Sequence, residues 1–131
     1  MRAIALALCF SASAARAETP RVNYMLQCQG CHGAEGRGAP GTVPSLEGVG
    51  RFLGVPGGRE YLVRVPGSSQ SALSDAELAE VLNWMVREFD PRDFVPYGAE
   101  EVARVRRPPL DDVDGVRREL LRRIEGASRE R

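Results

Sequence analysis

The stretch Cys28-Gln29-Gly30-Cys31-His32 decides how this chain is interpreted, because it has the form C-x-x-C-H. That form is typical of a c-type haem attachment site, in which two thiols form thioethers with the haem vinyl groups. Two intervening residues place both sulfurs on one side of a single helical turn. The histidine that follows can then bind the iron as its proximal ligand. The motif therefore predicts one covalent haem c held by Cys28 and Cys31, with His32 on the iron.

Two other chemistries share the C-x-x-C spacing, and the rest of the sequence argues against both. A zinc site would need two further ligands, yet His32 is the only histidine and the only other cysteine, Cys9, lies in the N-terminal segment. A thioredoxin-like redox pair would sit beside a βαβ pattern, and the sequence has no strand pattern. Haem attachment is the interpretation that remains.

The first seventeen residues have the pattern of a secretory signal peptide. Arg2 supplies the positive start, residues 3–12 form a short apolar run, and Ala15-Arg16-Ala17 gives a small-x-small cleavage site. We therefore expect cleavage near Ala17 and a periplasmic mature chain without a membrane span, since the apolar run is too short to cross a bilayer. Cys9 leaves a lipoprotein alternative, which the preceding leucine disfavours because a small residue is wanted there.

Length and charge narrow the function classes. After cleavage, the 131-residue chain is long enough for one domain with a modest core. Two arginines leave with the signal peptide, so the side-chain net charge of the mature chain is −2. Nucleic-acid binding would need a basic patch, and nothing in the sequence suggests one. Every basic side chain is an arginine, which excludes lysine as an iron ligand.

A glycine-rich region follows the attachment motif. Residues 30–67 hold 11 of the 14 glycines, which predicts mostly loop. Because glycine lets the backbone approach a flat cofactor closely, we expect this loop to wrap around the haem. A helix from about Arg21 to Gln29 should precede it, with Pro20 at its start, and a short helix is expected near Glu60–Val65.

The strongest helix signal begins at Ser74. Ser74 and Glu77 form a capping box, apolar residues then recur at helical spacing, and Asp90-Pro91 ends the helix. The following sequence is helical and rich in Arg and Glu, with a break at Pro108-Pro109. We expect residues 96–131 to form a charged helical extension, mainly a solvated helix with a frayed end. Docking on the domain and binding of a partner are the alternatives.

Beyond the attachment motif, the chain resembles class I c-type cytochromes. Pro44 lies twelve residues after His32, in a Pro-Ser-Leu-Glu-Gly segment that is similar to the family's P-x-L-x-G loop. The resemblance implies that the Pro44 carbonyl orients the imidazole. It also implies that Tyr24 and Trp84 pair between the first and last helices of the core. The expected fold is an all-α, cytochrome c-like domain at residues 18–95, wrapped around one covalent haem.

The distal iron ligand is where this chain departs from the family. The family usually has a methionine shortly before its last core helix, and the matching place here is Val65-Pro66. Met85 is a candidate distal ligand, and Met25 is a weaker one. If neither methionine binds, the sixth position is vacant, holds water, or takes an oxygen or nitrogen ligand from the loop around Ser68, Ser69 and Gln70.

Two functions from different classes remain. The resemblance implies a periplasmic electron carrier, not an enzyme, that exchanges electrons with a dehydrogenase or respiratory oxidase. Four arginines are candidates to pair with haem propionates or to steer that partner. The alternative is a protein that binds CO, NO or peroxide at an open distal site, although no second histidine is present to handle a proton. The four arginines are Arg37, Arg51, Arg59 and Arg64.

Overall fold

The structure is a computed structural model that describes residues 19–129, so the predicted signal peptide at residues 1–17 lies outside the described residues. Between residues 19 and 129 the chain forms α-helices and one 3-10 helix and no strand, which confirms the predicted all-α class. The elements in chain order are α1 (Pro20–Gln27), α2 (Gln29–His32), η1 (Val49–Gly54), α3 (Gly58–Arg64), α4 (Pro66–Ser69), α5 (Asp75–Phe89), α6 (Ala99–Val105) and α7 (Val113–Arg129).

The predicted first helix is interrupted inside the attachment motif. Cys28 has a φ of −124° and separates α1 from α2. Its carbonyl accepts hydrogen bonds from the backbone N–H groups of Cys31 and His32, at 3.2 and 3.0 Å. These bonds start a new helical turn at the motif, so the single helix expected over residues 21–29 becomes two.

Helices α1 and α5 are joined by aromatic rings. The rings of Tyr24 and Trp84 have centroids 5.0 Å apart, which confirms the predicted pair. Phe89 adds a third ring, 5.4 Å from Tyr24 and 5.6 Å from Trp84. Tyr24 is 1% exposed, and its hydroxyl donates to the Gly33 carbonyl at 2.6 Å. This aromatic cluster therefore fixes the attachment motif, one turn after Tyr24, against α5.

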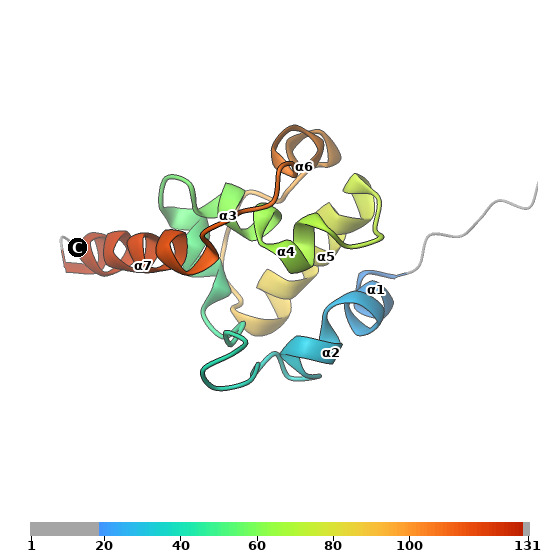
Figure 1. Cartoon of the computed structure of the whole chain (residues 1–131), viewed down its shortest axis with the longest axis horizontal. Helices are drawn as coiled ribbons and strands as arrows, with labels where there is room; N and C mark the ends of the chain where they lie inside the picture. The colour runs from blue at the N-terminus through green and yellow to red at the C-terminus, as the bar shows by residue number, and fades with distance from the viewer. Residues whose placement is uncertain (1–18, 130–131) are drawn as a thin grey trace, which may run out of the picture.

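The predicted capping box begins α5. The Ser74 hydroxyl accepts from the Glu77 backbone N–H at 3.2 Å, and the Glu77 carboxylate accepts from the Ser74 N–H at 2.8 Å. The helix ends at Phe89, directly before Asp90-Pro91, as the sequence predicted. In Figure 1, α5 runs diagonally, with α1 and α2 on one side and α3 and α4 on the other.

The segment between α2 and η1 folds back on the attachment motif. The Gly38 N–H donates to the His32 carbonyl, and the Leu46 N–H donates to the Gly36 carbonyl, at 2.8 and 2.7 Å. Gly38 has a φ of +67°, and a Cβ there would lie 2.3 Å from the Val43 carbonyl oxygen. Only glycine fits this close return, which brings Pro44 back to His32.

The short helix after this segment is displaced from its predicted limits. It was expected near residues 60–65, and α3 instead covers Gly58–Arg64. Gly57, with a φ of +83°, precedes it, and Pro66 opens the separate helix α4. No helix within residues 19–129 is long and apolar enough to cross a membrane.

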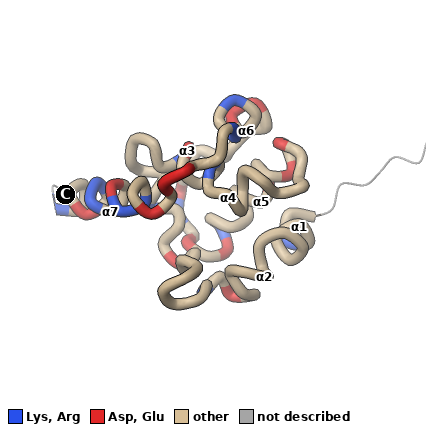
Figure 2. The backbone as a smooth tube through the Cα atoms, viewed as in Figure 1, with Lys and Arg blue, Asp and Glu red and all other residues tan. Residues whose placement is uncertain are grey.

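The C-terminal extension packs on the rest of the molecule, so the expectation of a mainly solvated helix is wrong for residues 97–124. Tyr97, Val102, Leu120 and Ile124 are each under 8% exposed and belong to the same core cluster as α5. The pattern of charges hid this packing, because acidic and basic residues are interspersed along α7 (Figure 2). The apolar stripe between those charges is narrow, yet it faces the core.

Candidate haem site

His32 is held by a backbone carbonyl. Its Nδ1 lies 3.1 Å from the Pro44 carbonyl oxygen. A carbonyl only accepts, so Nδ1 carries the proton and the lone pair is on Nε2, the atom free to bind a metal. Burial lowers the pKa of His32, and the hydrogen bond to Pro44 opposes that change only in part. The imidazole is therefore poised in the neutral form that a metal requires.

The two cysteines of the motif are free thiols separated by one helical turn. Cys28 is half-buried against the core, and burial followed by the proximity of Cys31 raises the pKa of Cys28 to about 11. Cys31 is exposed. One sulfur position thus faces the interior and the other the surface, on the same turn that presents His32.

A cavity of about 330 Å³ opens beside this turn. Cys31 and His32 line it, together with residues of the returning loop, η1, α3, α4, α5 and α7. Its other walls are mainly aliphatic and aromatic, including Phe52 and Leu82. An imidazole with a free Nε2, the Cys31 thiol in the cavity wall, the Cys28 thiol on the same turn and apolar walls form a set that fits a covalently attached haem.

The candidate distal ligands have different positions. Met85 is 8% exposed and lines the cavity. Met25 is 48% exposed and does not line the cavity, which rules out a role at this site. Of the three candidates at residues 68–70, only Ser68 lines the cavity. The Ser69 hydroxyl donates to the Arg106 carbonyl at 2.6 Å, and Gln70 is exposed.

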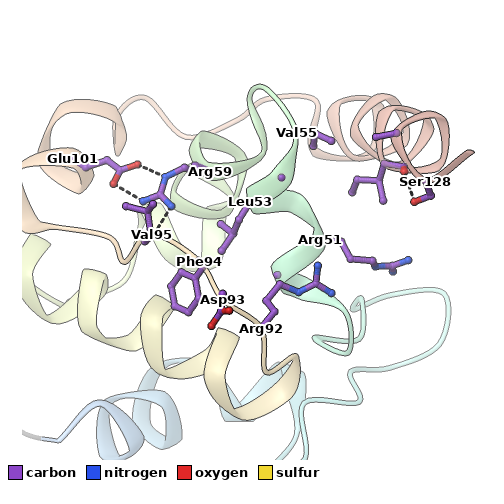
Figure 3. A pocket seen from close by; sticks show the side chains of 14 residues that line it. Arg51, Leu53, Val55, Arg59, Arg92, Asp93, Phe94, Val95, Glu101 and Ser128 are labelled. Carbon is purple, nitrogen blue, oxygen red and sulfur yellow. Dashed lines mark hydrogen bonds and ion pairs between the residues drawn. The ribbon is translucent and has the colours of Figure 1, made fainter. Parts of the chain in front are cut away.

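The four arginines proposed for the propionates do not line this cavity. Arg59 and Arg51 line a separate depression of about 700 Å³ between η1, the segment before α6, and the end of α7 (Figure 3). There the Arg59 guanidinium binds the Glu101 carboxylate at 2.6 and 2.7 Å. Arg64 is bound to Glu60 and to the Pro108 carbonyl. Arg37 is exposed on the surface, 3.9 Å from Glu35.

The structure adds a residue that sequence reasoning missed. Arg117 of α7 lines the cavity, and so does Val113, one turn earlier on the same helix. The apolar stripe of α7, which includes Val113 and Leu120, indicated a packed face. The residue four positions after Val113 lies on that side. The four-residue spacing from Val113 could have indicated that Arg117 faces the core. The many charged residues of the segment favoured a solvated helix instead.

The comparisons with known proteins agree with this geometry. A protein named cytochrome c-552 from one strain of Thermus thermophilus is 34% identical over 119 residues, which cover 73% of this chain and 80% of that protein. The chain belongs to the c-type cytochromes. A second cytochrome c-552 from Thermus thermophilus is 36% identical over 107 residues, covering 64% of this chain and 82% of that protein. No family model matches.

Membership in the c-type cytochromes confirms three predictions made from the sequence. The recognised family is correct, the cofactor is covalently bound haem c, and the protein is an electron carrier rather than an enzyme. Electron transfer by a c-type haem is therefore its general function. The cofactor fits the residues present, since Cys31, His32 and apolar side chains line one cavity.

Proposed function

We propose that this c-type cytochrome is a periplasmic electron carrier with a single haem attached to Cys28 and Cys31 and ligated by His32. The observation that carries the proposal is the hydrogen bond from His32 Nδ1 to the Pro44 carbonyl, at the edge of the cavity. This bond orients the imidazole and leaves Nε2 free on the turn that also carries both thiols. When bound, the haem iron supplies the change between ferric and ferrous states.

The protein's own contribution is a fixed and mainly dry environment. Pro44 holds His32 in one tautomer, so the imidazole would keep its orientation when the charge on a bound iron changes. The aliphatic and aromatic walls would keep water from much of a bound haem. Cys31 is exposed, so the attachment edge is the part of the site from which an electron can leave to a partner.

Haem loading tests the attachment residues. Cys28→Ala and Cys31→Ala should each reduce or abolish stable covalent loading when the chain matures in an oxidising compartment, while Gln29→Ala, between them, should load normally. Covalent haem is measured by in-gel haem staining and by the mass of the intact chain. A doubly substituted chain with both cysteines removed that still carried covalent haem would refute the assignment.

Met85 is our proposed sixth ligand, because it is the one methionine that lines the cavity within the described residues. A bound thioether would give a low-spin ferric spectrum with a weak near-infrared sulfur-to-iron band, and the ferrous protein would not bind CO. Met85→Ala should then remove that band and admit CO, whereas Met25→Ala, at the surface, should not.

An open distal site is the second candidate, and one observation favours it. Val65, Pro66 and Ser68 line the cavity where the family usually provides a methionine, and they offer no sulfur or imidazole. A high-spin wild-type spectrum that shifts with CO, unchanged by Met85→Ala, would place binding of a small ligand ahead of simple electron transfer.

Export and partner choice need separate measurements. N-terminal sequencing of the mature chain from a periplasmic fraction should begin at Glu18. Retention of residues 1–17 would refute cleavage near Ala17. For the partner, the rates of reduction by a candidate dehydrogenase and of oxidation by a respiratory oxidase should exceed those with a non-cognate protein of similar charge. Equal rates would leave this cytochrome without specificity for that partner.

A further inference from the structure

Arg117 is the one Arg, Lys, Asp or Glu residue that lines the haem cavity within residues 19–129. It projects from α7, in the extension that lies outside the family resemblance. The remainder of the lining is largely aliphatic, aromatic or glycine, and no carboxylate is included. A cation in a mainly apolar cavity is costly unless an anion or hydrogen-bond acceptors compensate its charge.

The immediate surroundings of Arg117 are aromatic. Its guanidinium carbon lies 5.4 Å from the centre of the Phe52 ring. Burial raises the pKa of Tyr61, and the charge of Arg117 and a hydrogen bond from it oppose that rise. The guanidinium therefore lies close to two side chains of the cavity wall, Phe52 and Tyr61, whose rings stack on each other with centroids 5.2 Å apart. Cation–ring contact and a phenol hydroxyl compensate its charge only partly.

No carboxylate of the described chain lies within ion-pair distance of Arg117. Other inward-facing arginines differ in this respect: Arg59 pairs with Glu101 at 2.6 Å, and Arg106 pairs with Asp75 at 3.0 Å. Asp114 acts electrostatically on Tyr61, but it forms no ion pair with Arg117 at 4.0 Å or less. The protein thus leaves one cavity cation for an anion that is not part of the polypeptide.

We propose that Arg117 is the cationic partner of a haem propionate, which makes α7 part of the cofactor site. The inference rests on the proposed haem attachment at Cys28, Cys31 and His32. A planar guanidinium can bind a carboxylate through two parallel hydrogen bonds. The extension would then set the charge around the iron as well as complete the core, and Arg117 acts on the iron through the propionate as a positioning residue.

The reduction potential is the direct readout. Without Arg117, the negative charge of the propionate is uncompensated and favours the ferric state, so the midpoint potential should fall in Arg117→Gln. The propionate pKa should also rise in that variant, because its ionised form loses a partner. The midpoint potential should then increase with falling pH from a higher pH than in the wild type, as protonation removes negative charge.

The matched control lies next to Arg117 on the same helix. Arg118→Gln removes the same charge from an exposed position of α7, so it should leave the potential and its pH profile close to the wild type. Arg117→Lys should restore most of the potential while losing the two-point contact. Equal shifts in Arg117→Gln and Arg118→Gln, or no shift in either, would overturn the proposal.

A second measurement needs no variant. Infrared difference spectra between ferric and ferrous wild-type protein report the propionate carboxylates, and at least one should stay ionised below the pH at which an ordinary carboxyl titrates. Two propionates that titrate as ordinary carboxyls would overturn the proposal. Covalent haem is quantified in the same samples. An absence of attached haem would instead refute the proposed function, so the two failures are distinguishable.

Discussion

The attachment motif and the C-terminal extension are held to the same core by different interactions. Tyr24, Trp84 and Phe89 join the attachment motif to α5 through ring contacts at 5.0–5.6 Å. Arg106, at the end of α6, is only 7% exposed and instead uses hydrogen bonds to join the extension to residues 69–75. The Arg106 network consists of its bonds to the Ser69, Leu73 and Ser71 carbonyls, at 3.1, 2.7 and 2.8 Å, and to the Asp75 carboxylate, at 3.0 Å.

The two junctions should respond differently to substitution. Ring packing depends on buried area and shape, so its contribution changes with the volume removed. The Arg106 network depends on a donor for each carbonyl, and removing the guanidinium leaves several buried acceptors unpaired. The loop between α4 and α5, which follows cavity residue Ser68, is therefore held by the extension in addition to its own short-range hydrogen bonds.

Tyr24→Ala should have the largest effect on stability. It removes a ring that is 1% exposed and contacts two others, and we expect the haem-loaded protein to lose about 3–5 kcal/mol of unfolding free energy. Tyr24→Phe keeps the ring and loses only the bond to Gly33, so it should cost about 1–2 kcal/mol. Urea denaturation followed by circular dichroism measures both, and equal losses would contradict a packing role.

Arg106→Gln should have the next largest effect, a loss of about 3 kcal/mol, because buried carbonyls and Asp75 lose their donor. Arg104→Gln is the matched control, since Arg104 is exposed on the same helix, and it should change stability by less than about 0.5 kcal/mol. Hydrogen exchange should increase in residues 69–75 of the Arg106 variant alone. Unchanged protection there would show that the loop holds itself.

Ser74→Ala tests a local interaction in the same region. The hydroxyl caps α5 by accepting from the Glu77 N–H, and its loss should cost about 1 kcal/mol. Ser74→Thr retains an oxygen at the cap and should recover most of that loss. The same denaturation measurement applies, and a loss as large as that of Arg106→Gln would mean that the cap also supports tertiary contacts.

The ion pair at the surface depression should have the smallest effect, at most about 1 kcal/mol, and the effect should depend on pH. Hydrogen bonds from Arg59 hold the pKa of Glu101 below its ordinary value of 4.5. In the pH range between the lowered and the ordinary pKa, the unfolded chain binds more protons than the folded chain. The stabilising contribution is therefore complete above about pH 4.5 and disappears as pH falls through the folded pKa.

Comparison with Glu101→Gln isolates that contribution. The stability difference between wild type and Glu101→Gln should be constant from neutral pH to about pH 5 and then shrink in more acid solution. Glu100→Gln, at an exposed neighbouring position of α6, should show no such change. A difference that grows toward acid pH would have the opposite sign to the one expected from a lowered pKa.

Short-range sequence patterns correctly predicted the start of α5 and the position of Tyr24 on α1. Ser74 and Glu77 are three residues apart, and Tyr24 lies one turn before Cys28, so local periodicity is enough to place them. The same reasoning failed at Cys28, where bonds to the following turn interrupt the helix. It also did not show that Arg59 pairs with Glu101, because that pairing joins chain segments 42 residues apart that only the fold brings together.

The proposed haem attachment is encoded locally, since Cys28, Cys31 and His32 are close in the chain and belong to one helical turn. The family and the capped helix α5 are encoded in the same way, because they depend on spacings of a few residues. Only the tertiary structure decided how the extension contacts the domain. Arg106 forms hydrogen bonds with a loop about 35 residues earlier, and Arg117 lies in the cavity wall beside Phe52. Contacts at such separation depend on how whole helices pack, and no local period encodes which polar side chain will be enclosed.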